Sequence, residues 1–396
     1  MKSGQPCKQK PASRPSGQVE ALYLHVPFCR AKCRYCDFYS LPLEESAALA
    51  YVEAAAAELR AHQHHLARPL ESVFLGGGTP TVLGPELLGR LLSLCSPLVG
   101  PRTEVTAEAN PGTIDAAVVE ALTAGKVNRA SLGAQSFLPE ELALLGRIHR
   151  VEQIAQAVTL LRSAGIGNIS LDLIYGIPGQ TMATWRQSLQ QALGLQVDHL
   201  SCYALSFEEG TALAADLRAG TVHDMDEELQ RDCYYAAIEA AAAAGMEHYE
   251  ISNFARPGRR CRHNLTYWHN LPYLGIGPAA ASYVGGIRRT NRPDLRQYVQ
   301  ALQAGQAPPA DCEQLTGRAL MAETMMLGLR LIEGVHRDDF AARFGADPVA
   351  AFPQSLGRYQ QQGLLAVTPT HVRLASDAIF VADAILADIV DEGGTG

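Results

Sequence analysis

Three cysteines near the N-terminus have the residue type and spacing of a metal-cluster site. Cys29, Cys33 and Cys36 form a C-x3-C-x2-C pattern on a short loop, directly after an aromatic and β-branched run. Thiolates this close together can surround one side of a compact cluster, and soft sulfur ligands select iron–sulfur, zinc or copper(I). Structural zinc and a closed [4Fe–4S] cluster each need four protein ligands. Three cysteines therefore favour an iron–sulfur cluster with one iron open to a small molecule.

Two other interpretations of these cysteines stay open at this point. A zinc knuckle could take a fourth ligand such as His25, or the three cysteines could be unrelated buried thiols. The remaining cysteines lack paired spacing, which suits reduced thiols in a reducing compartment, and an oxygen-sensitive cluster needs the same compartment. These remaining cysteines are Cys7, Cys95, Cys202, Cys233, Cys261 and Cys312.

A glycine-rich loop is the second candidate for ligand contact. Gly76, Gly77 and Gly78 are consecutive and precede Thr79 and Pro80. Glycines let a backbone approach a ligand closely and adopt positive φ without strain. Such loops most often hold phosphate, but this one has no Walker lysine and no spaced G-x-G-x-x-G. Together with the cysteine loop, it indicates a site for a small molecule beside the cluster.

Polar residues follow further predicted strands. Glu108 ends one apolar run, Gln135 follows the next, Arg147 lies shortly beyond, and Asp172 lies in a fifth run. In parallel α/β barrels the chemistry sits at the C-terminal ends of the strands. Any one of these residues alone could be a rim hydrogen bond, but together they predict one shared site.

The elements that must position these residues show a βα rhythm between Val19 and about Ala204. The expected strands are Ala21–Val26, Ser72–Leu75, Glu104–Glu108, Arg129–Gly133, Ile169–Leu173 and His199–Tyr203. The expected helices are Ala47–Leu66, Pro85–Leu98, Ala116–Ala124, Val151–Ala164 and Met182–Gly194. Eight such units would close a barrel, so six predict an α/β fold with an open, partial (β/α)6 barrel.

The rest of the chain is expected to form a barrel-associated segment and a C-terminal domain. An Ala-rich helix after Asp224 is followed by a strand-like run, Glu247–Ser252. Later patterns indicate helices, then a hairpin, then a last helix, which resembles a winged-helix-like, mostly helical domain; they are Leu315–Leu331, Arg337–Phe344, Pro348–Gly363, Leu365–Val367, Val372–Leu374 and Ala378–Val390. The expected divisions are a disordered tail (1–18), the barrel core (19–204), the associated segment (205–305) and the C-terminal domain (306–396).

Composition restricts the environment and the partners. The chain has 396 residues, of which 47% are hydrophobic, so it can bury a large core. Its formal net charge is −8, which gives no overall field that favours nucleic acid. There is no 18-residue apolar span and no signal-peptide pattern, so we expect a cytoplasmic protein.

These motifs, in this order, resemble the radical S-adenosylmethionine (SAM) superfamily, and over residues 20–390 the oxygen-independent coproporphyrinogen III oxidase family. The resemblance implies that Cys29, Cys33 and Cys36 hold a [4Fe–4S] cluster, and that Tyr23, Gly77 and Glu108 contact the SAM bound to it. The dehydrogenase branch of that family has a second SAM site. The positions here that match it are Tyr35, Gly78, Thr79, Gln135, Arg147, Asp172 and Ala204, with Ala281 near one more family contact.

Two departures separate the chain from the dehydrogenase branch. That branch has a further cysteine where this chain has Phe38, and a long N-terminal segment where this chain has about twenty residues before the first strand. The run His263-Asn264-Leu265-Thr266-Tyr267-Trp268 matches the H-N-x-x-Y-W motif of the heme-chaperone branch. A histidine beside aromatic rings suits heme ligation and packing, whereas the alternative is a buried histidine among core aromatics. A basic run could bind porphyrin propionates or be simple solvated charge; it comprises Arg256, Arg259, Arg260 and Arg262.

The resemblance implies a heme chaperone that binds heme and transfers it to respiratory haemoproteins, with the cluster and SAM gating transfer. It leaves room for a heme donor protein, peripheral membrane contact and a homodimer. The alternative is a radical enzyme that cleaves SAM and removes hydrogen from porphyrinogen propionates, namely a coproporphyrinogen III dehydrogenase. A zinc-binding scaffold is the third hypothesis.

Overall fold

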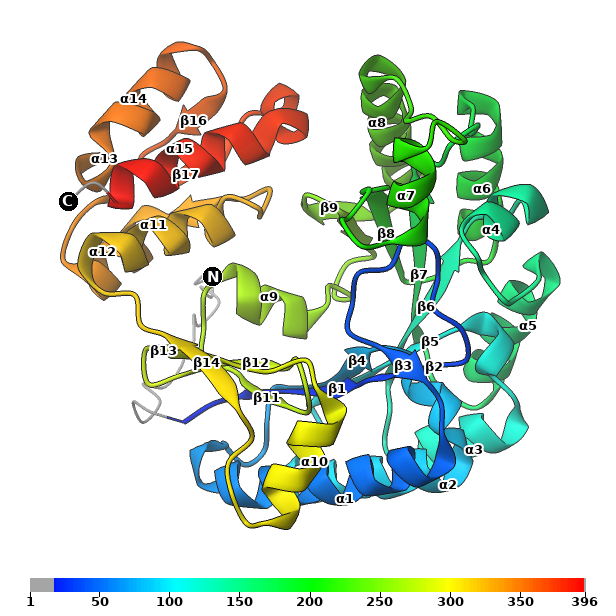
Figure 1. The fold of residues 1–396 in the computed structure, drawn as a ribbon. Coiled ribbons are helices and arrows are strands. Elements are labelled where there is room, and N and C mark those ends of the chain that lie inside the picture. Colours follow the sequence, from blue (N-terminus) through cyan, green and yellow to red (C-terminus); the bar gives the residue numbers. More distant parts are fainter. Residues whose placement is uncertain (1–17, 395–396) are drawn as a thin grey trace, which may run out of the picture.

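A curved, mostly parallel sheet organises the computed structural model, which describes residues 18–394 (Figure 1). The strand order in this 9-stranded sheet is β11-β1-β4-β5-β6-β7-β8-β10-β9. Its strands are β1 (Ala21–Val26), β4 (Ser72–Gly77), β5 (Glu104–Ala109), β6 (Arg129–Gln135), β7 (Asn168–Tyr175), β8 (His199–Ala204), β9 (Glu247–Glu250), β10 (Asn253–Ala255) and β11 (Leu274–Ile276). The expected tail lies outside the described residues, apart from residue 18.

The six predicted strands are all present, and they pair in parallel in chain order from β1 to β8. This confirms the expected partial (β/α)6 barrel. Strand β11 adds a further parallel strand beside β1, and β10 and β9 add an antiparallel edge beside β8. The segment after residue 204 therefore extends the same sheet at both edges.

Helices on the outer side of the curved sheet connect its strands (Figure 1). Several begin with a side-chain cap, such as Asp115, whose carboxylate accepts a hydrogen bond from the Val118 N–H. Thr181 and Asp226 cap two other helices in the same way. The helices are α1 (Glu45–His62), α2 (Gly84–Cys95), α3 (Ala116–Ala124), α4 (Pro139–Leu144), α5 (Val151–Ser163), α6 (Met182–Gly194), α7 (Ala212–Arg218) and α8 (Glu227–Ala243).

The register of the parallel strands brings the polar strand ends to one edge of the sheet. Glu108 in β5 pairs with Ser131 in β6, and Gly133 in β6 pairs with Asp172 in β7. Asp172 pairs in turn with Ser201 in β8. The two candidate carboxylates, Glu108 and Asp172, therefore lie near one another although they are 64 positions apart in the sequence.

A second, 3-stranded sheet lies beside β11 (Figure 1), and a short helix comes between its second and third strands in the chain. Its strand β14 pairs with β13, so β14 belongs structurally to the segment before the boundary expected at 306. Short strands β2 (Phe28–Cys29) and β3 (Leu41–Pro42) flank the cysteine loop. The elements of this region are α9 (Arg262–Trp268), β12 (Ala281–Val284), β13 (Ile287–Asn291), α10 (Leu295–Gln303) and β14 (Ala310–Glu313).

The C-terminal module contains helices and a small antiparallel sheet, and it forms a separate group at upper left in Figure 1. The predicted hairpin is present, and β15 joins it as a third strand in the order β15-β17-β16. The predicted helix over Pro348–Gly363 is interrupted near Phe352. The elements are α11 (Gly317–Gly328), β15 (Val335–His336), α12 (Arg337–Phe344), α13 (Pro348–Ala351), α14 (Pro353–Gln361), β16 (Leu365–Val367), β17 (His371–Leu374) and α15 (Ala382–Gly394).

In the described part of the chain, none of the helices combines the length and the apolar character needed to cross a bilayer.

Candidate cluster and SAM site

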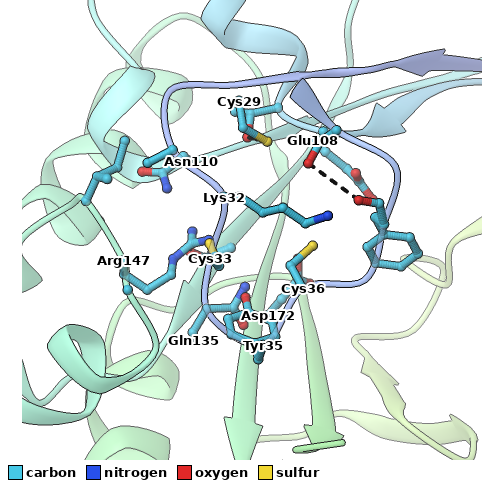
Figure 2. A pocket seen from close by; sticks show the side chains of 18 of the residues that line it. Cys29, Lys32, Cys33, Tyr35, Cys36, Glu108, Asn110, Gln135, Arg147 and Asp172 are labelled. Carbon is cyan, nitrogen blue, oxygen red and sulfur yellow. Dashed lines mark hydrogen bonds between the residues drawn. The ribbon is translucent and has the colours of Figure 1, made fainter. Parts of the chain in front are cut away.

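The C-terminal ends of the strands and the cysteine loop surround a pocket of about 490 Å³. Most of the residues predicted for the site line it, although they come from widely separated parts of the chain (Figure 2). Those that line it are Cys29, Cys33, Tyr35, Cys36, Gly77, Gly78, Thr79, Glu108, Gln135, Arg147, Asp172 and Ala204.

The three cysteines are partly exposed to this pocket. In Figure 2 their sulfur atoms face a common space, into which Lys32 also reaches. The guanidinium of Arg147 donates to Cys33 Sγ at 3.1 Å and to the Gly133 carbonyl at 2.5 Å, so it connects the cysteine loop to β6. Within residues 18–394, no three His, Cys, Asp or Glu side chains are grouped to hold a single metal ion. Three soft donors around an open cavity fit a larger group such as an iron–sulfur cluster.

The glycine loop is packed against β1 and the residues that follow it. Gly77 has φ +98°, and a Cβ added there would lie 2.5 Å from the ring of His25. A Cβ on Gly78 would lie 2.5 Å from the Phe28 carbonyl oxygen. We expected these glycines to make room for a ligand, but the neighbours that exclude a side chain are residues of this chain. The loop therefore lines the pocket with its backbone while its glycines allow close packing behind it.

Two carboxyl groups face the pocket, one from β5 and one from β7, with β6 between these strands. Glu108 accepts a hydrogen bond from the Gly77 N–H at 3.1 Å, and burial followed by the charge of Asp172 raises the pKa of Glu108 to about 7. Burial also raises the pKa of Asp172, although its hydrogen bond from Ser201 at 2.7 Å opposes that rise. Both carboxyl groups would be stabilised in ionised form by a cationic ligand.

Two buried polar atoms in the pocket wall have no hydrogen-bond partner among the described residues. Gln135 Oε1 and Arg147 Nε are both buried without a hydrogen bond. Gln135 also has φ +65°, an uncommon conformation for a residue other than glycine, which directs it from the end of β6. Buried polar atoms normally have partners, so this wall suits a ligand that carries polar groups of its own.

Two predicted SAM contacts lie outside the pocket lining. The Tyr23 hydroxyl bonds to His25 Nδ1 at 3.0 Å, which places it behind the glycine loop. Ala281 pairs with Thr290 at the start of β12. For these two residues the SAM contact stays a prediction from the resemblance.

Sequence reasoning predicted no ligand contact for several other residues of the pocket wall. Asn110 accepts from the Gly112 N–H at 2.9 Å and lines the pocket just after β5, where its position at a strand end was a usable signal. Lys32 and Phe38 belong to the cysteine loop, and Phe38 is 64% exposed at the mouth. Tyr203 also lines the pocket, near the end of β8.

The histidine of the H-N-x-x-Y-W motif is buried, on α9. Its Nδ1 bonds to Ser72 Oγ at 2.9 Å and its Nε2 bonds to the Tyr267 hydroxyl at 2.8 Å. The ring stacks on Phe74 with 5.1 Å between ring centroids, and burial lowers the pKa of His263 to about 3. With both nitrogens bonded, the imidazole has no lone pair free for heme iron in this conformation. This geometry matches the alternative of a buried histidine among aromatic residues.

Trp268 faces the other side of α9, in a groove shared with the C-terminal module. The guanidinium of Arg330 lies over its indole ring, 4.7 Å from the ring centroid, and the indole N–H has no partner in the part of the chain that the structure describes. The walls are mostly apolar, and they include Met326, Leu327, Leu386, Ala387 and Val390. Of the three residues predicted to contact heme, Trp268 is the one that lines this groove.

The basic run beside the motif is occupied by contacts within the chain. Arg256 donates to the Val197 carbonyl, and Arg262 donates to the Arg102 carbonyl at 2.7 Å. Arg259 and Arg260 form ion pairs, with Asp198 at 3.7 Å and with Glu247 at 3.2 Å respectively. Contact between this run and porphyrin propionates therefore stays a prediction, and the structure shows these guanidiniums engaged within the chain.

Comparisons with known proteins agree with this fold. Residues 23–192 match the radical SAM superfamily model, and residues 315–381 match the HemN C-terminal domain model. The structure of coproporphyrinogen III oxidase HemN from Escherichia coli, described as a radical SAM enzyme, superposes with a TM-score of 0.81 at 22% identity, over 96% of this chain and 91% of that one. Fold and site thus define a radical SAM protein that carries a HemN-type C-terminal domain.

Relatives with higher identity narrow this class. The heme chaperone HemW of Synechocystis is 42% identical over 80% of this chain and 79% of its own, and that of Bacillus subtilis is 32% identical over 94% and 100%. A Bos taurus protein named radical S-adenosyl methionine domain-containing protein 1, mitochondrial, is 32% identical over 96% and 90%. The chain belongs to the HemW family.

Membership of the radical SAM superfamily implies a [4Fe–4S] cluster and SAM, and the pocket fits both. Cys29, Cys33 and Cys36 would hold the cluster, which in its reduced form would supply an electron to bound SAM. The unpartnered atoms of Gln135 and Arg147 and the Glu108 carboxylate are placed to bind and orient a polar, cationic ligand.

Proposed function

We propose that this protein is a heme chaperone, which binds heme and transfers it to haemoproteins of the respiratory chain while carrying a SAM-ligated [4Fe–4S] cluster. The observation that carries the proposal is the combination of a complete cysteine and glycine-loop pocket with 32–42% identity to proteins named heme chaperone HemW. A cytoplasmic location belongs to the same proposal.

The heme would lie against the Trp268 side of α9. This part of the proposal rests on an exposed apolar groove that offers an indole face, an arginine, and the Met326 thioether, which is of a ligand type used by cytochromes. Tyr267 and His263 bond to each other at 2.8 Å and do not line this groove. The charged residues that line the groove are Asp383, Asp391 and Arg330. Among these lining residues Arg330 is the cation, so it would pair with a heme propionate.

The experiment is anaerobic reconstitution with iron and sulfide, followed by heme titration with and without SAM. We expect the reconstituted protein to bind heme. We also expect it to transfer heme to an apo-cytochrome, and this transfer should depend on the cluster. A reconstituted protein that binds no heme in either condition would overturn the chaperone proposal.

The cluster part is tested with single cysteine variants. Cys29→Ser, Cys33→Ser and Cys36→Ser should each lose most of the bound iron and the cluster absorbance, because among the described residues no other cysteine lines the pocket to replace the missing thiolate. Cys95→Ser and Cys202→Ser change thiols that are 1% exposed and far from the loop in sequence, and they should keep both signals. Normal iron content in all three loop variants would contradict the assignment.

The second candidate function is a coproporphyrinogen III dehydrogenase. The pocket favours it in one respect, since every residue matched to the second SAM site lines the wall except Ala281. Against it stands Phe38 at the mouth, where the dehydrogenase branch has a cysteine. An anaerobic assay with coproporphyrinogen III, SAM and a reductant separates the two, because decarboxylated product would favour the enzyme.

A further inference from the structure

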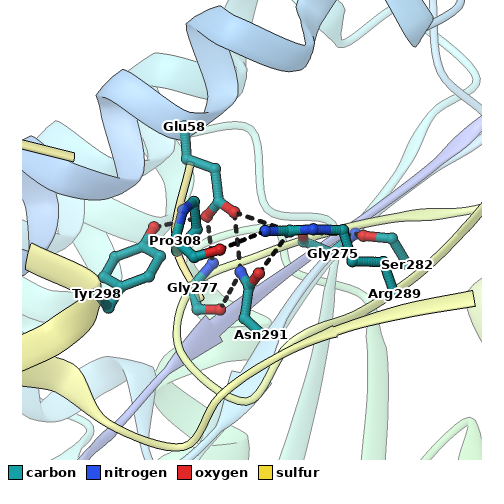
Figure 3. A network of polar contacts seen from close by, with 8 residues as sticks. All are labelled: Glu58, Gly275, Gly277, Ser282, Arg289, Asn291, Tyr298 and Pro308. Atoms are coloured by element: carbon teal, nitrogen blue, oxygen red, sulfur yellow. Dashed lines mark hydrogen bonds and ion pairs between the residues drawn. The ribbon is translucent and has the colours of Figure 1, made fainter. Parts of the chain in front are cut away.

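Glu58 in α1 is a buried carboxylate, 1% exposed, among residues of the loop after β11, β13 and α10 (Figure 3). Its Oε2 accepts hydrogen bonds from the Gly277 N–H at 2.9 Å and the Tyr298 hydroxyl at 2.7 Å. Its Oε1 accepts from the Asn291 amide at 2.8 Å and lies 3.9 Å from the Arg289 guanidinium. A carboxylate has only acceptor sites, so this set of donors matches its ionised form. Burial raises the pKa of Glu58, and the hydrogen bonds oppose that rise.

The first route from Glu58 to the site runs through the loop after β11. Glu58 holds the N–H of Gly277, and Asn291 holds its carbonyl at 2.8 Å. Gly277 has φ +110°, and a Cβ there would lie 2.5 Å from the His25 carbonyl oxygen. Both the N–H and the carbonyl of Gly277 are therefore held by hydrogen bonds. Its backbone packs against His25 of β1, next to the glycine loop.

The second route runs through α10. Tyr298 in α10 bonds to Glu58, and the Leu295 N–H at the start of the same helix donates to the Tyr39 hydroxyl at 2.7 Å. The Tyr39 carbonyl accepts from His25 Nε2 at 2.9 Å. Tyr39 lies three positions after Cys36. Both routes therefore end at His25 and at the segment that leaves the cysteine loop.

We propose that Glu58 is a positioning residue for the cluster and SAM site, which fixes the exit of the cysteine loop through Gly277 on one side and Tyr298 on the other. Glu58 does not line the pocket, so it acts through these contacts rather than by touching a ligand. A fully hydrogen-bonded buried carboxylate resists displacement, because breaking one contact leaves a buried charge without its partner. The part that concerns SAM rests on the proposed function.

The main test is Glu58→Gln, which keeps the shape of the side chain. It replaces one acceptor oxygen of the carboxylate by an NH2 group, which cannot accept the hydrogen bonds of the surrounding donors. After anaerobic reconstitution we expect wild-type iron content and a roughly tenfold weaker SAM affinity, the scale seen when groups that orient metal ligands are changed. The affinity is read from the SAM-induced change in the EPR spectrum of the reduced cluster. Faster hydrogen exchange at the Leu295 amide is expected in the protein without cluster.

Tyr298→Phe removes one hydroxyl and keeps α10, so it tests the same route if Glu58→Gln does not fold. We expect SAM affinity about threefold weaker, in line with loss of one hydrogen bond. The matched control is Glu323→Gln, a carboxylate buried elsewhere that accepts from Asn270 Nδ2 at 3.0 Å and pairs with Arg288 at 2.7 Å. It should lose stability but keep the SAM response, and Glu53→Gln, on the exposed face of α1, should change neither.

The proposal is wrong if Glu58→Gln, or Tyr298→Phe where the first does not fold, keeps wild-type SAM affinity and Leu295 exchange. It is also wrong if Glu323→Gln weakens SAM binding as much, since a general loss of stability would then explain the effect. If the wild-type protein binds no SAM, the proposed function fails instead, and hydrogen exchange at Leu295 still decides whether Glu58 fixes the loop.

Discussion

The imidazole of His25 connects three parts of the site that are distant in the sequence. Because Nε2 donates to the Tyr39 carbonyl at 2.9 Å, Nδ1 is the acceptor for the Tyr23 hydroxyl at 3.0 Å. Its ring also fills the space beside Gly77. Both nitrogens are thus used, which argues against the zinc knuckle completed by His25. Burial lowers the pKa of His25, so the neutral ring that this geometry needs is favoured.

A comparable pattern at His263 leads to a prediction about heme. His263→Ala should lower the free energy of unfolding by about 1–3 kcal/mol, because it leaves Ser72 and Tyr267 without their shared partner. The Soret maximum of the heme complex should stay unchanged. Trp268→Ala should instead weaken heme binding with little loss of stability, since that ring is part of an open groove. Urea unfolding and heme titration measure the two effects, and a shifted Soret band in His263→Ala would restore the axial-ligand hypothesis.

Glu108 leads to a prediction about pH. Its pKa is raised from 4.5 to about 7 by burial and by Asp172, so the folded protein holds a proton there that the unfolded chain releases. The resulting stability is fully present below about pH 4.5 and is lost as pH rises through about 7. We expect the free energy of unfolding of the cluster-free protein to fall across that window, and to fall less steeply in Glu108→Gln. Equal slopes in urea titrations of both proteins would contradict the assigned pKa.

At the scale of elements, the sequence was most informative where contacts are local. Strands β1 and β4 to β8 are apolar runs separated by helical patterns, and parallel strands buried on both faces leave that signature. The pairing of β11 with β1 could not be predicted, because three residues from a segment about 250 positions later carry no sign of their partner. Glu58 was missed for a similar reason, since within an Ala-rich helix a buried glutamate looks like a solvated one.

The same distinction applies to the candidate site. The motif residues at strand ends were found because strand direction alone brings Glu108, Gln135 and Asp172 to one edge. The packing of His25 against Gly77 was not found from the sequence, because the imidazole ring beside this glycine of β4 comes from another strand, β1. The aromatic motif on α9 suggested ligation, whereas its histidine is satisfied by Ser72 in β4, 191 positions away.

The glycine loop between β4 and α2 gives a prediction at this scale. Gly77→Val should disturb the site as a whole, because its side chain would displace His25 and so release the Tyr39 segment. We expect weaker SAM binding together with a less stable cluster, measured as iron retained after gel filtration. Gly89→Ala is the control, since a Cβ there meets no atom within 4 Å. Full iron retention with SAM binding abolished would show instead that the glycine serves the ligand directly.

On the scale of the whole molecule, the contacts of Asn270 connect the C-terminal module to the segment after α9, and we call this set of contacts the joint. Asn270, just after α9, is 2% exposed and donates to Glu323 Oε2 and Thr324 Oγ1, both at 3.0 Å, on α11. Its own carbonyl accepts from Arg343 at 3.0 Å on α12. The Trp268 groove is formed across this joint, by α9 on one side and α11 and α15 on the other. The cluster pocket is lined by other elements, so the two sites are separable.

This separation leads to a prediction that uses two substitutions of one residue. Asn270 has φ +48°, a conformation that costs alanine roughly 1 kcal/mol but that glycine adopts freely. Asn270→Ala and Asn270→Gly both remove the two buried hydrogen bonds, so both should lower the free energy of unfolding by about 1–3 kcal/mol. The alanine variant is destabilised further by its positive φ in the folded state. The glycine variant avoids this strain, but it loses part of the advantage because glycine gives the unfolded chain more conformational freedom. Heme titration should weaken to a similar degree in both variants, because the groove loses the contact that aligns its walls, while iron content after reconstitution stays at the wild-type level. A glycine variant with wild-type stability and heme affinity would mean that the joint depends on backbone conformation and not on the amide.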